Sequence, residues 1–219
     1  MTPATVYRAS GLSLLLGSVV LISGAIIRVL AGADPANPHL ATGWSIQAVG
    51  AMLVVLGLPG LYACQVQATG LLGLLGIVGT TLFFLIHGVF VGLLHGLVLP
   101  ALATRAPDLA TTAPPSVGLV LFSAALLGTL GTLLLGSATV RAGILPRWAG
   151  ASIIVGGVAV FVGHGRGLHL DDAGLIILMV GLAGLGVHLL SAAHWHTNIP
   201  AVGLASGGVP RRQAGRSGL

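Results

Sequence analysis

The sequence predicts an all-α fold, a polytopic transmembrane helix bundle, and three observations carry that prediction. Of the 219 residues, 55% are hydrophobic and 6% are charged, whereas a soluble domain carries about 25% charged residues. The mean hydropathy is +1.05. Apolar stretches as long as a bilayer is thick recur along the chain. Together these features exclude a soluble enzyme and a disordered chain, and the single cysteine, Cys64, excludes a disulfide scaffold.

Six apolar segments are long enough to be considered as spans, since a crossing takes about 20 residues, with a range of roughly 17–25. The segment at 71–99 is long enough to tilt or to project from the bilayer. The segment at 148–162 is the shortest, and whether it crosses fully is left open. The six predicted spans are residues 12–30, 44–62, 71–99, 117–140, 148–162 and 173–193.

Helix-breaking residues justify the boundaries of these segments in order. Pro146 lacks an N–H group and can therefore open the fifth helix without losing a hydrogen bond. Residues 1–196 then form one six-helix domain, and residues 197–219, rich in Arg, Gly and Ser, form a cytoplasmic tail that we expect to be disordered. The breakers are Asp34-Pro35, Asn37-Pro38, Ala68-Thr69-Gly70, Pro100, Pro107, Pro114-Pro115, Pro146 and the stretch 163–172.

The nine arginines predict the orientation, because cytoplasmic loops carry an excess of positive charge. With both termini in the cytoplasm, six arginines lie inside and three outside, and all four aspartates lie outside. Trp44 then begins a span at the outer surface, as expected of an amphipathic ring. The arginines scatter over helix ends and form no basic face, which excludes a nucleic-acid partner. The inner set is Arg8, Arg141, Arg147, Arg211, Arg212 and Arg216; the outer set is Arg28, Arg105 and Arg166.

Small residues recur at helical spacing on two of the predicted spans. Gly88, Gly92 and Gly96 follow one another every four residues on the third span. Ser10, Gly17, Gly24 and Ala31 repeat every seven residues on the first. Such ridges let helix backbones approach closely in lipid. We expect them to pack within the bundle; contact with a membrane-protein partner or with a second copy of the chain is the alternative.

Two short motifs resemble those of a known group of proteins. One is the sequence from Gly57 to Tyr62, Gly-Leu-Pro-Gly-Leu-Tyr, and the other runs from Arg141 to Gly150 around Leu145-Pro146-Arg147-Trp148. The chain loosely resembles uncharacterised bacterial six-span integral membrane proteins that have a Leu-Pro-Arg-Trp turn before the fifth helix. The resemblance implies a helical bundle in the bacterial inner (plasma) membrane. It implies no activity, and it does not extend to the histidines.

Eight histidines against four acidic residues are the one unusual feature of the composition. Ionisable groups within a membrane are costly and are therefore candidates for function. At 1.5 Å of rise per residue, His95 and His164 lie near the outer boundary, and His87 lies about 3 Å from the centre of its span. These three are the candidate ligands of a haem or related pigment, which needs axial imidazoles and room beside small residues.

A metal site is the second chemical hypothesis for the outer surface. His95, His164, His169, Asp171 and Asp172 offer a donor set suited to Zn or Cu. No HExxH or CxxC pattern supports it, and His87 and His95, about 80° apart around an α-helix, cannot serve one ion from that helix alone. Imidazoles that are merely hydrogen-bonded near the interface are the plainer interpretation. The two aspartates also suit the positive end of the sixth helix dipole.

Arg28 lies one turn from the outer end of the first span. We expect its side chain to snorkel outward to the interface. The alternative is an ion pair with Asp171 or Asp172 across the outer mouth of the bundle.

Three functions remain open at this stage. The first is a non-enzymatic structural or accessory subunit that carries no cofactor, since no nucleophile motif and no glutamate are present. The second is a membrane protein with a His-ligated cofactor, a haem, pigment, Zn or Cu, near the outer surface. The third is a small transporter or channel, which the scarcity of polar groups within the spans disfavours.

Overall fold

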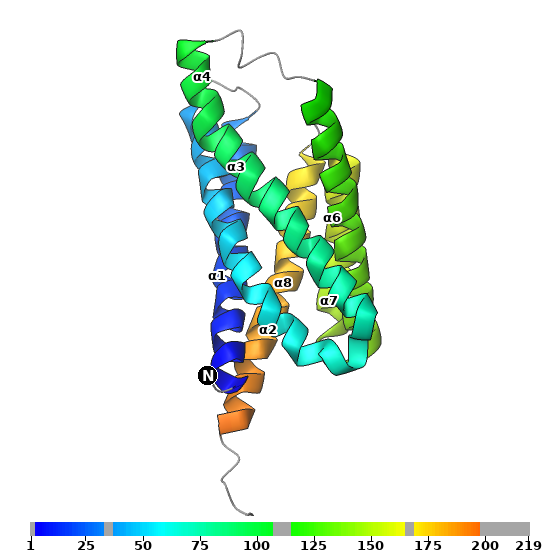
Figure 1. Cartoon of the computed structure of the whole chain (residues 1–219). Helices are drawn as coiled ribbons and strands as arrows, with labels where there is room; N and C mark the ends of the chain where they lie inside the picture. The colour runs from blue at the N-terminus through cyan, green and yellow to red at the C-terminus, as the bar shows by residue number, and fades with distance from the viewer. Residues whose placement is uncertain (1–2, 33–36, 107–114, 165–168, 198–219) are drawn as a thin grey trace, which may run out of the picture.

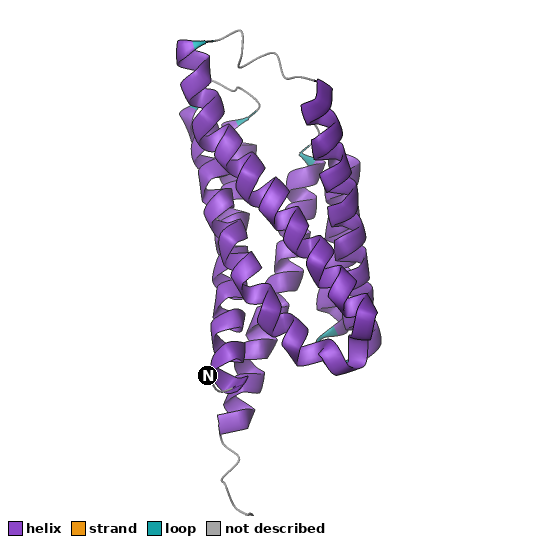
Figure 2. Ribbon diagram, in the orientation of Figure 1, coloured by secondary structure: helices purple, strands orange, loops and turns teal. Residues whose placement is uncertain are grey.

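The computed structural model describes residues 3–32, 37–106, 115–164 and 169–197. For residues 115–116 and 192–197 it describes the backbone alone. All the regular structure in this part of the chain is helical (Figure 2). Of the predicted tail, residues 197–219, Thr197 ends a helix and the rest lies outside the described residues, as do Asp34, Asp108 and Arg166. The elements are α1 (Pro3–Ala31), α2 (Pro38–Phe83), the π-helix η1 (Phe84–Phe90), α3 (Val91–Leu93), the π-helix η2 (Leu94–Val98), α4 (Leu99–Arg105), α6 (Pro115–Ala142), α7 (Arg147–Gly163) and α8 (Leu170–Thr197).

The chain reverses direction at Gly70, inside the stretch assigned to α2. Gly70 has φ 52° and ψ −135°, a conformation that glycine alone adopts at little cost. Residues 38–69, the first arm, descend beside α1, and residues 71–105, the second arm, rise again through η1, α3, η2 and α4 (Figure 1). The sequence predicted a break at Ala68-Thr69-Gly70, and the structure confirms it.

In the described part of the chain, six helical rods pack in a closed ring: α1, the first arm, the second arm, α6, α7 and α8. The first arm packs on α1, α1 on α8, α8 on α7, α7 on α6 and α6 on the second arm. The second arm returns to the first through Gly88, Gly92 and Gly96, which lie against residues 41–51. Fully buried leucines fill the centre; they include Leu14, Leu21, Leu58, Leu182 and Leu185.

Glycines lie where the backbones of neighbouring rods approach most closely. A methyl group on Gly17 of α1 would lie 2.8 Å from the backbone nitrogen of Val54 in the first arm. A methyl group on Gly131 of α6 would lie 2.5 Å from the backbone nitrogen of Thr80 in the second arm. Both separations are too short for any side chain. Close approach of this kind supplies the dispersion contacts that hold helices together in lipid.

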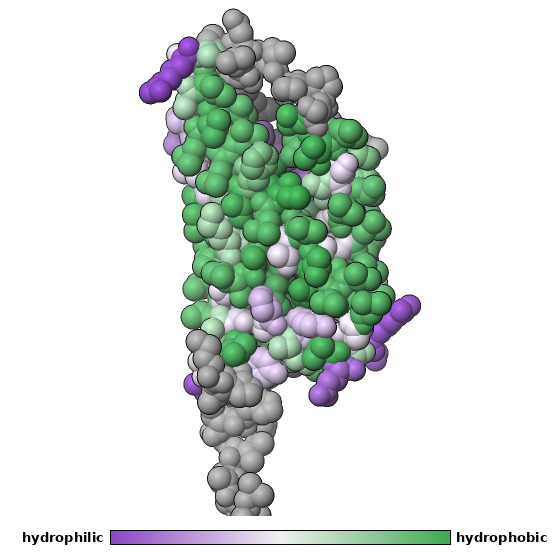
Figure 3. All heavy atoms as spheres, in the orientation of Figure 1, coloured by the Kyte–Doolittle hydropathy of each residue, from purple (hydrophilic) through white to green (hydrophobic). Residues whose placement is uncertain are grey.

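The lengths and composition of the rods agree with a protein that crosses a membrane more than once. Among the described residues, four helices are long and apolar enough to span a bilayer, and one of them is the 68-residue stretch that Gly70 divides. The shorter α7 is apolar over 17 residues and begins after Pro146, as predicted. On the face seen in Figure 3, apolar residues cover the middle of the molecule, and strongly hydrophilic ones protrude near the two ends.

Candidate functional site

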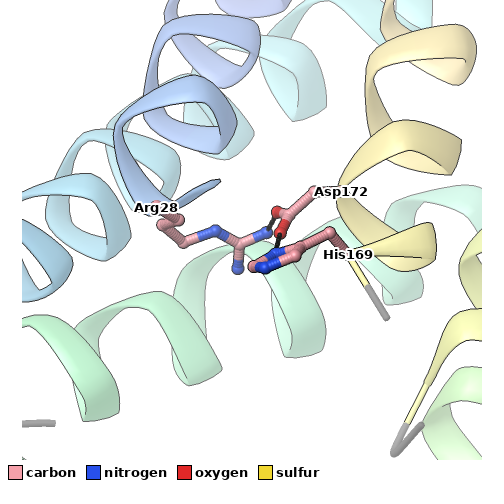
Figure 4. A network of polar contacts seen from close by, with 3 residues as sticks. All are labelled: Arg28, His169 and Asp172. Atoms are coloured by element: carbon pink, nitrogen blue, oxygen red, sulfur yellow. Dashed lines mark hydrogen bonds and ion pairs between the residues drawn. The ribbon is translucent and has the colours of Figure 1, made fainter. Parts of the chain in front are cut away.

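An ion pair joins α1 to α8 at the end of the bundle where α1 stops and α8 begins, here called the upper end. The guanidinium of Arg28 donates a hydrogen bond to the carboxylate of Asp172, and Figure 4 shows the two side chains pointing toward each other. Arg28 is 6% exposed. The expectation that Arg28 snorkels outward is therefore wrong and its alternative is confirmed, because Asp172 lies within reach inside the bundle.

The same guanidinium lies against an aromatic ring of the first arm. The Cζ atom of Arg28 is 3.8 Å from the centre of the Trp44 ring. A cation over an indole face is attracted by the ring quadrupole. The imidazole of His169 lies on the other side of the carboxylate, with Nδ1 3.7 Å from Oδ2 of Asp172. Arg28 and Asp172 thus neutralise each other, and both are held by further contacts.

Beside this ion pair lies a cavity of about 240 Å³ to which all six rods contribute. Its apolar walls include Phe83, Val91, Leu121, Val160 and Leu175. Its polar lining consists of three imidazoles, one amide, one indole, one guanidinium and one carboxylate: His87, His95, His164, Gln47, Trp44, Arg28 and Asp171.

His87 is the most unusual member of this lining. Its ring stacks on Phe83, with centroids 5.3 Å apart, and meets His164 edge-on, with centroids 5.2 Å apart. Both ring nitrogens are buried, and neither has a hydrogen-bond partner in the described part of the chain. A buried polar group without a partner costs about 1–3 kcal/mol. Native proteins rarely leave such groups unsatisfied, so the two nitrogens of His87 call for a partner of their own.

The π-helical segments of the second arm explain how His87 and His95 reach the same cavity. The backbone N–H of Val91 bonds to the carbonyl of Ile86, and that of Leu99 bonds to the carbonyl of Leu94, each five residues back. A turn closed in this way takes an extra residue and rotates less per residue than an α-turn. The separation of about 80° expected of a regular α-helix therefore does not apply. Short π-helical segments occur frequently at functional sites.

His95 is fixed by contacts on two sides. Its Nδ1 lies 3.0 Å from the carbonyl oxygen of Val91, and a carbonyl only accepts, so Nδ1 carries the proton. In the neutral ring Nε2 is then left as an acceptor. The ring stacks on Trp44, with centroids 4.7 Å apart. His95 therefore offers the cavity an oriented acceptor, as part of a stack with Trp44 and Arg28.

Gln47 on the first arm adds a second unsatisfied group to the cavity wall. The residue is 6% exposed, and its Oε1 atom has no hydrogen-bond partner among the described residues. Gln47 was not among the residues singled out from the sequence, and Trp44 was expected only as an interface anchor. The signal was present, because an uncharged amide within a predicted span is as conspicuous as a histidine there.

The structure sorts the predicted site residues into two neighbouring groups. His87, His95 and His164, the candidate cofactor residues, line one cavity together with Asp171. His169 and Asp172 belong to the ion-pair cluster with Arg28. Within the described residues, no three His, Cys, Asp or Glu side chains gather in a way that could hold a metal ion. The five-residue metal set is thus divided between the two groups, because Asp172 is drawn to Arg28.

Comparison with known proteins adds no relative: no family model, no curated protein and no solved structure matches this chain. The geometry of the cavity therefore carries the functional argument.

Proposed function

We propose that this chain is a six-span protein of the bacterial inner (plasma) membrane, with both termini in the cytoplasm. Each arm on either side of Gly70 is longer than the roughly 20 residues that a crossing needs. At 17 residues, α7 has the minimum length of the usual range for a crossing, roughly 17–25 residues. Both observations support six crossings.

The charged residues support the proposed orientation. Arg8 lies early in α1, Arg141 in the last turn of α6 and Arg147 at the start of α7. These helix ends lie at the end of the bundle that holds the N-terminus, called the lower end (Figure 1). The aspartates that pair or cluster with Arg28 lie at the other end. Because positive charge is retained in the cytoplasm, the lower end is the cytoplasmic one, and the cavity opens toward the outer half of the membrane.

Within this architecture, we propose that the protein is a non-enzymatic subunit that binds a small ligand in the cavity. The observation that carries the proposal is the pair of buried, unpartnered ring nitrogens of His87. A ligand that accepts a hydrogen bond from one nitrogen and donates to the other removes their desolvation cost. The Oε1 atom of Gln47 and the Nε2 atom of His95 offer two more acceptors to the same ligand.

The size of the cavity limits the ligand. At about 240 Å³ it is smaller than the pockets of about 300–1,000 Å³ that hold drug-sized molecules. A single-ring molecule or headgroup fits this volume better than a macrocycle does. Of the cofactors that the histidines suggested, haem and related pigments are therefore the poorest match to the geometry.

The experiment that tests this proposal compares two histidine variants. The protein and its His87→Leu and His188→Leu variants are purified in nanodiscs, and small molecules are extracted and measured by mass spectrometry. His188 lies on α8 and does not line the cavity, so its variant is a matched control. We expect a molecule to co-purify with the parent protein and with His188→Leu.

Loss of this molecule from His87→Leu, with circular dichroism unchanged, supports the proposal. Loss of one hydrogen bond lowers affinity by about three- to tenfold. If no small molecule beyond bulk lipid is released from the parent protein, or if both variants retain it equally, the proposed binding role is wrong.

A further inference from the structure

The cavity has an apolar neighbour on the side of the molecule that faces lipid. A groove of about 170 Å³ lies between the second arm and α6, and it is lined by Phe90, Val117, Val120 and Leu121. Leu121 lines the cavity as well. Phe90 and Val120 are 55% and 61% exposed, which places them on the outer surface of the bundle. The groove and the histidine cavity therefore meet at one side chain.

The helices that border the groove separate toward the upper end. Along α6, Gly131 lies against the backbone of the second arm, whereas a methyl group on Gly118 would meet nothing within 4 Å. The second arm turns instead toward the first arm, where Gly92 lies against the backbone of Trp44. Leu121 thus lies between the polar cavity and open apolar surface.

The charges around the cavity select the kind of headgroup. The guanidinium of Arg28 is already paired with Asp172, and Asp171 adds a carboxylate to the lining. Among the described residues that line the cavity, an anionic head such as a phosphate would find no unpaired cation, and the carboxylate would repel it. A neutral head that exchanges hydrogen bonds with imidazoles meets no such penalty.

The aromatic rings around the cavity favour a flat headgroup. His87 stacks on Phe83, and His95 stacks on Trp44, so two pairs of flat rings stand in the lining. Flat aromatic heads pack well against such rings. An oxygen atom on the edge of a ring can accept a hydrogen bond from His87, and a ring hydroxyl can donate one to Nε2 of His95.

We propose that the ligand is an isoprenoid quinone or quinol, which enters from the bilayer between the second arm and α6. Its ring occupies the histidine cavity, where a ring oxygen of either form accepts a hydrogen bond from His87 and a hydroxyl of the quinol donates one to Nε2 of His95. Its apolar chain leaves past Leu121 along the groove. This proposal rests on the binding role proposed above and adds the ligand class and the route.

A binding titration tests the ring and the chain separately. Trp44, in the cavity wall, reports binding by fluorescence quenching in a Trp148→Phe/Trp195→Phe background, in nanodiscs. The probes are a quinone with a ten-carbon chain and the same quinone without a chain. Empty nanodiscs correct for partitioning into lipid. We expect both probes to bind saturably and His87→Leu to weaken both.

Leu121→Phe overfills the junction of cavity and groove. We expect it to weaken the tailed quinone by about tenfold and to leave the tailless one within about twofold. Leu119→Phe is the matched control, since Leu119 is 68% exposed on the same helix and lines neither space; it should change neither affinity.

The other outcomes separate the two proposals. If Leu121→Phe weakens both probes equally or neither, the route past Leu121 is wrong. If neither quinone binds while mass spectrometry still finds another His87-dependent molecule, the quinone assignment is wrong and the binding role stands. If neither quinone binds and no molecule co-purifies, both proposals fail.

Discussion

Two helix–helix interfaces of the bundle, here called seams, can be compared: the first joins α1 to α8, and the second joins α6 to the second arm. Both are closed in the same way at the lower end, and they differ at the upper end. Below, glycines bring the backbones together: Gly11 lies against Gly186 in the first seam, and Gly79 against Gly131 in the second. Above, an ion pair from Arg28 to Asp172 bridges α1 and α8. No such bridge joins α6 to the second arm in the described residues; the apolar groove lies there and meets the histidine cavity at Leu121.

The difference shows how a chain made almost entirely of apolar residues can still localise chemistry. Where small residues face each other, the helices have room for nothing else. Where they stop, the helices diverge, and the space between them is either bridged by long charged side chains or left for a ligand. Polar groups are costly in lipid, so in the bridged seam and in the cavity alike they face the interior of the bundle.

The largest expected effect is at the bridged seam. Arg28→Met leaves Asp172 as a buried carboxylate without its cation, and breaking a buried pair costs about 3–5 kcal/mol. We expect the apparent Tm in detergent to fall by at least about 6 °C. The double variant Arg28→Met/Asp172→Leu should recover most of the loss. An unchanged Tm for the single variant would show that the ion pair does not hold this seam.

The next effect compares two glycines of α6. Gly131→Ala places a methyl group against the backbone of the second arm, which cannot rotate away as a side chain could, and we expect a loss of about 1–3 kcal/mol. Gly118→Ala meets open space and gains helix propensity, so its stability should be equal or higher. Thermal unfolding of both variants in one detergent measures the contrast. Equal losses at the two positions would mean that the seam is not closed at Gly131.

The smallest effect belongs to the rim of the ion-pair cluster. The side chain of His169 is 54% exposed, and its contact with Asp172 is that of a solvent-screened pair. His169 has φ 44°, so His169→Asn is the suitable change, because asparagine tolerates that backbone conformation. We expect less than about 1 kcal/mol by thermal unfolding. A larger loss would show that His169, and not Arg28 alone, holds Asp172.

Much of the site was visible in the sequence, and its assembly was not. His87, His95, His164 and Asp171 were singled out as ionisable groups in or beside apolar segments, and all four line the cavity. Their grouping depends on two π-helical turns, which rotate His87 and His95 relative to a regular α-helix. Gln47 was missed because only ionisable groups were considered, although an amide within a predicted span is as conspicuous as an imidazole.

The sequence by itself determined the all-helical class, the break at Gly70 and the start of α7 after Pro146. These features follow from local properties: hydropathy, the conformational freedom of glycine and the missing N–H of proline. Only the tertiary structure decided that Arg28 turns inward to Asp172, and that the histidines share one cavity while His169 and Asp172 do not complete a metal set. Such pairings depend on the relative rotation and separation of rods that are distant in the chain, and apolar helices of uniform hydropathy leave both undetermined.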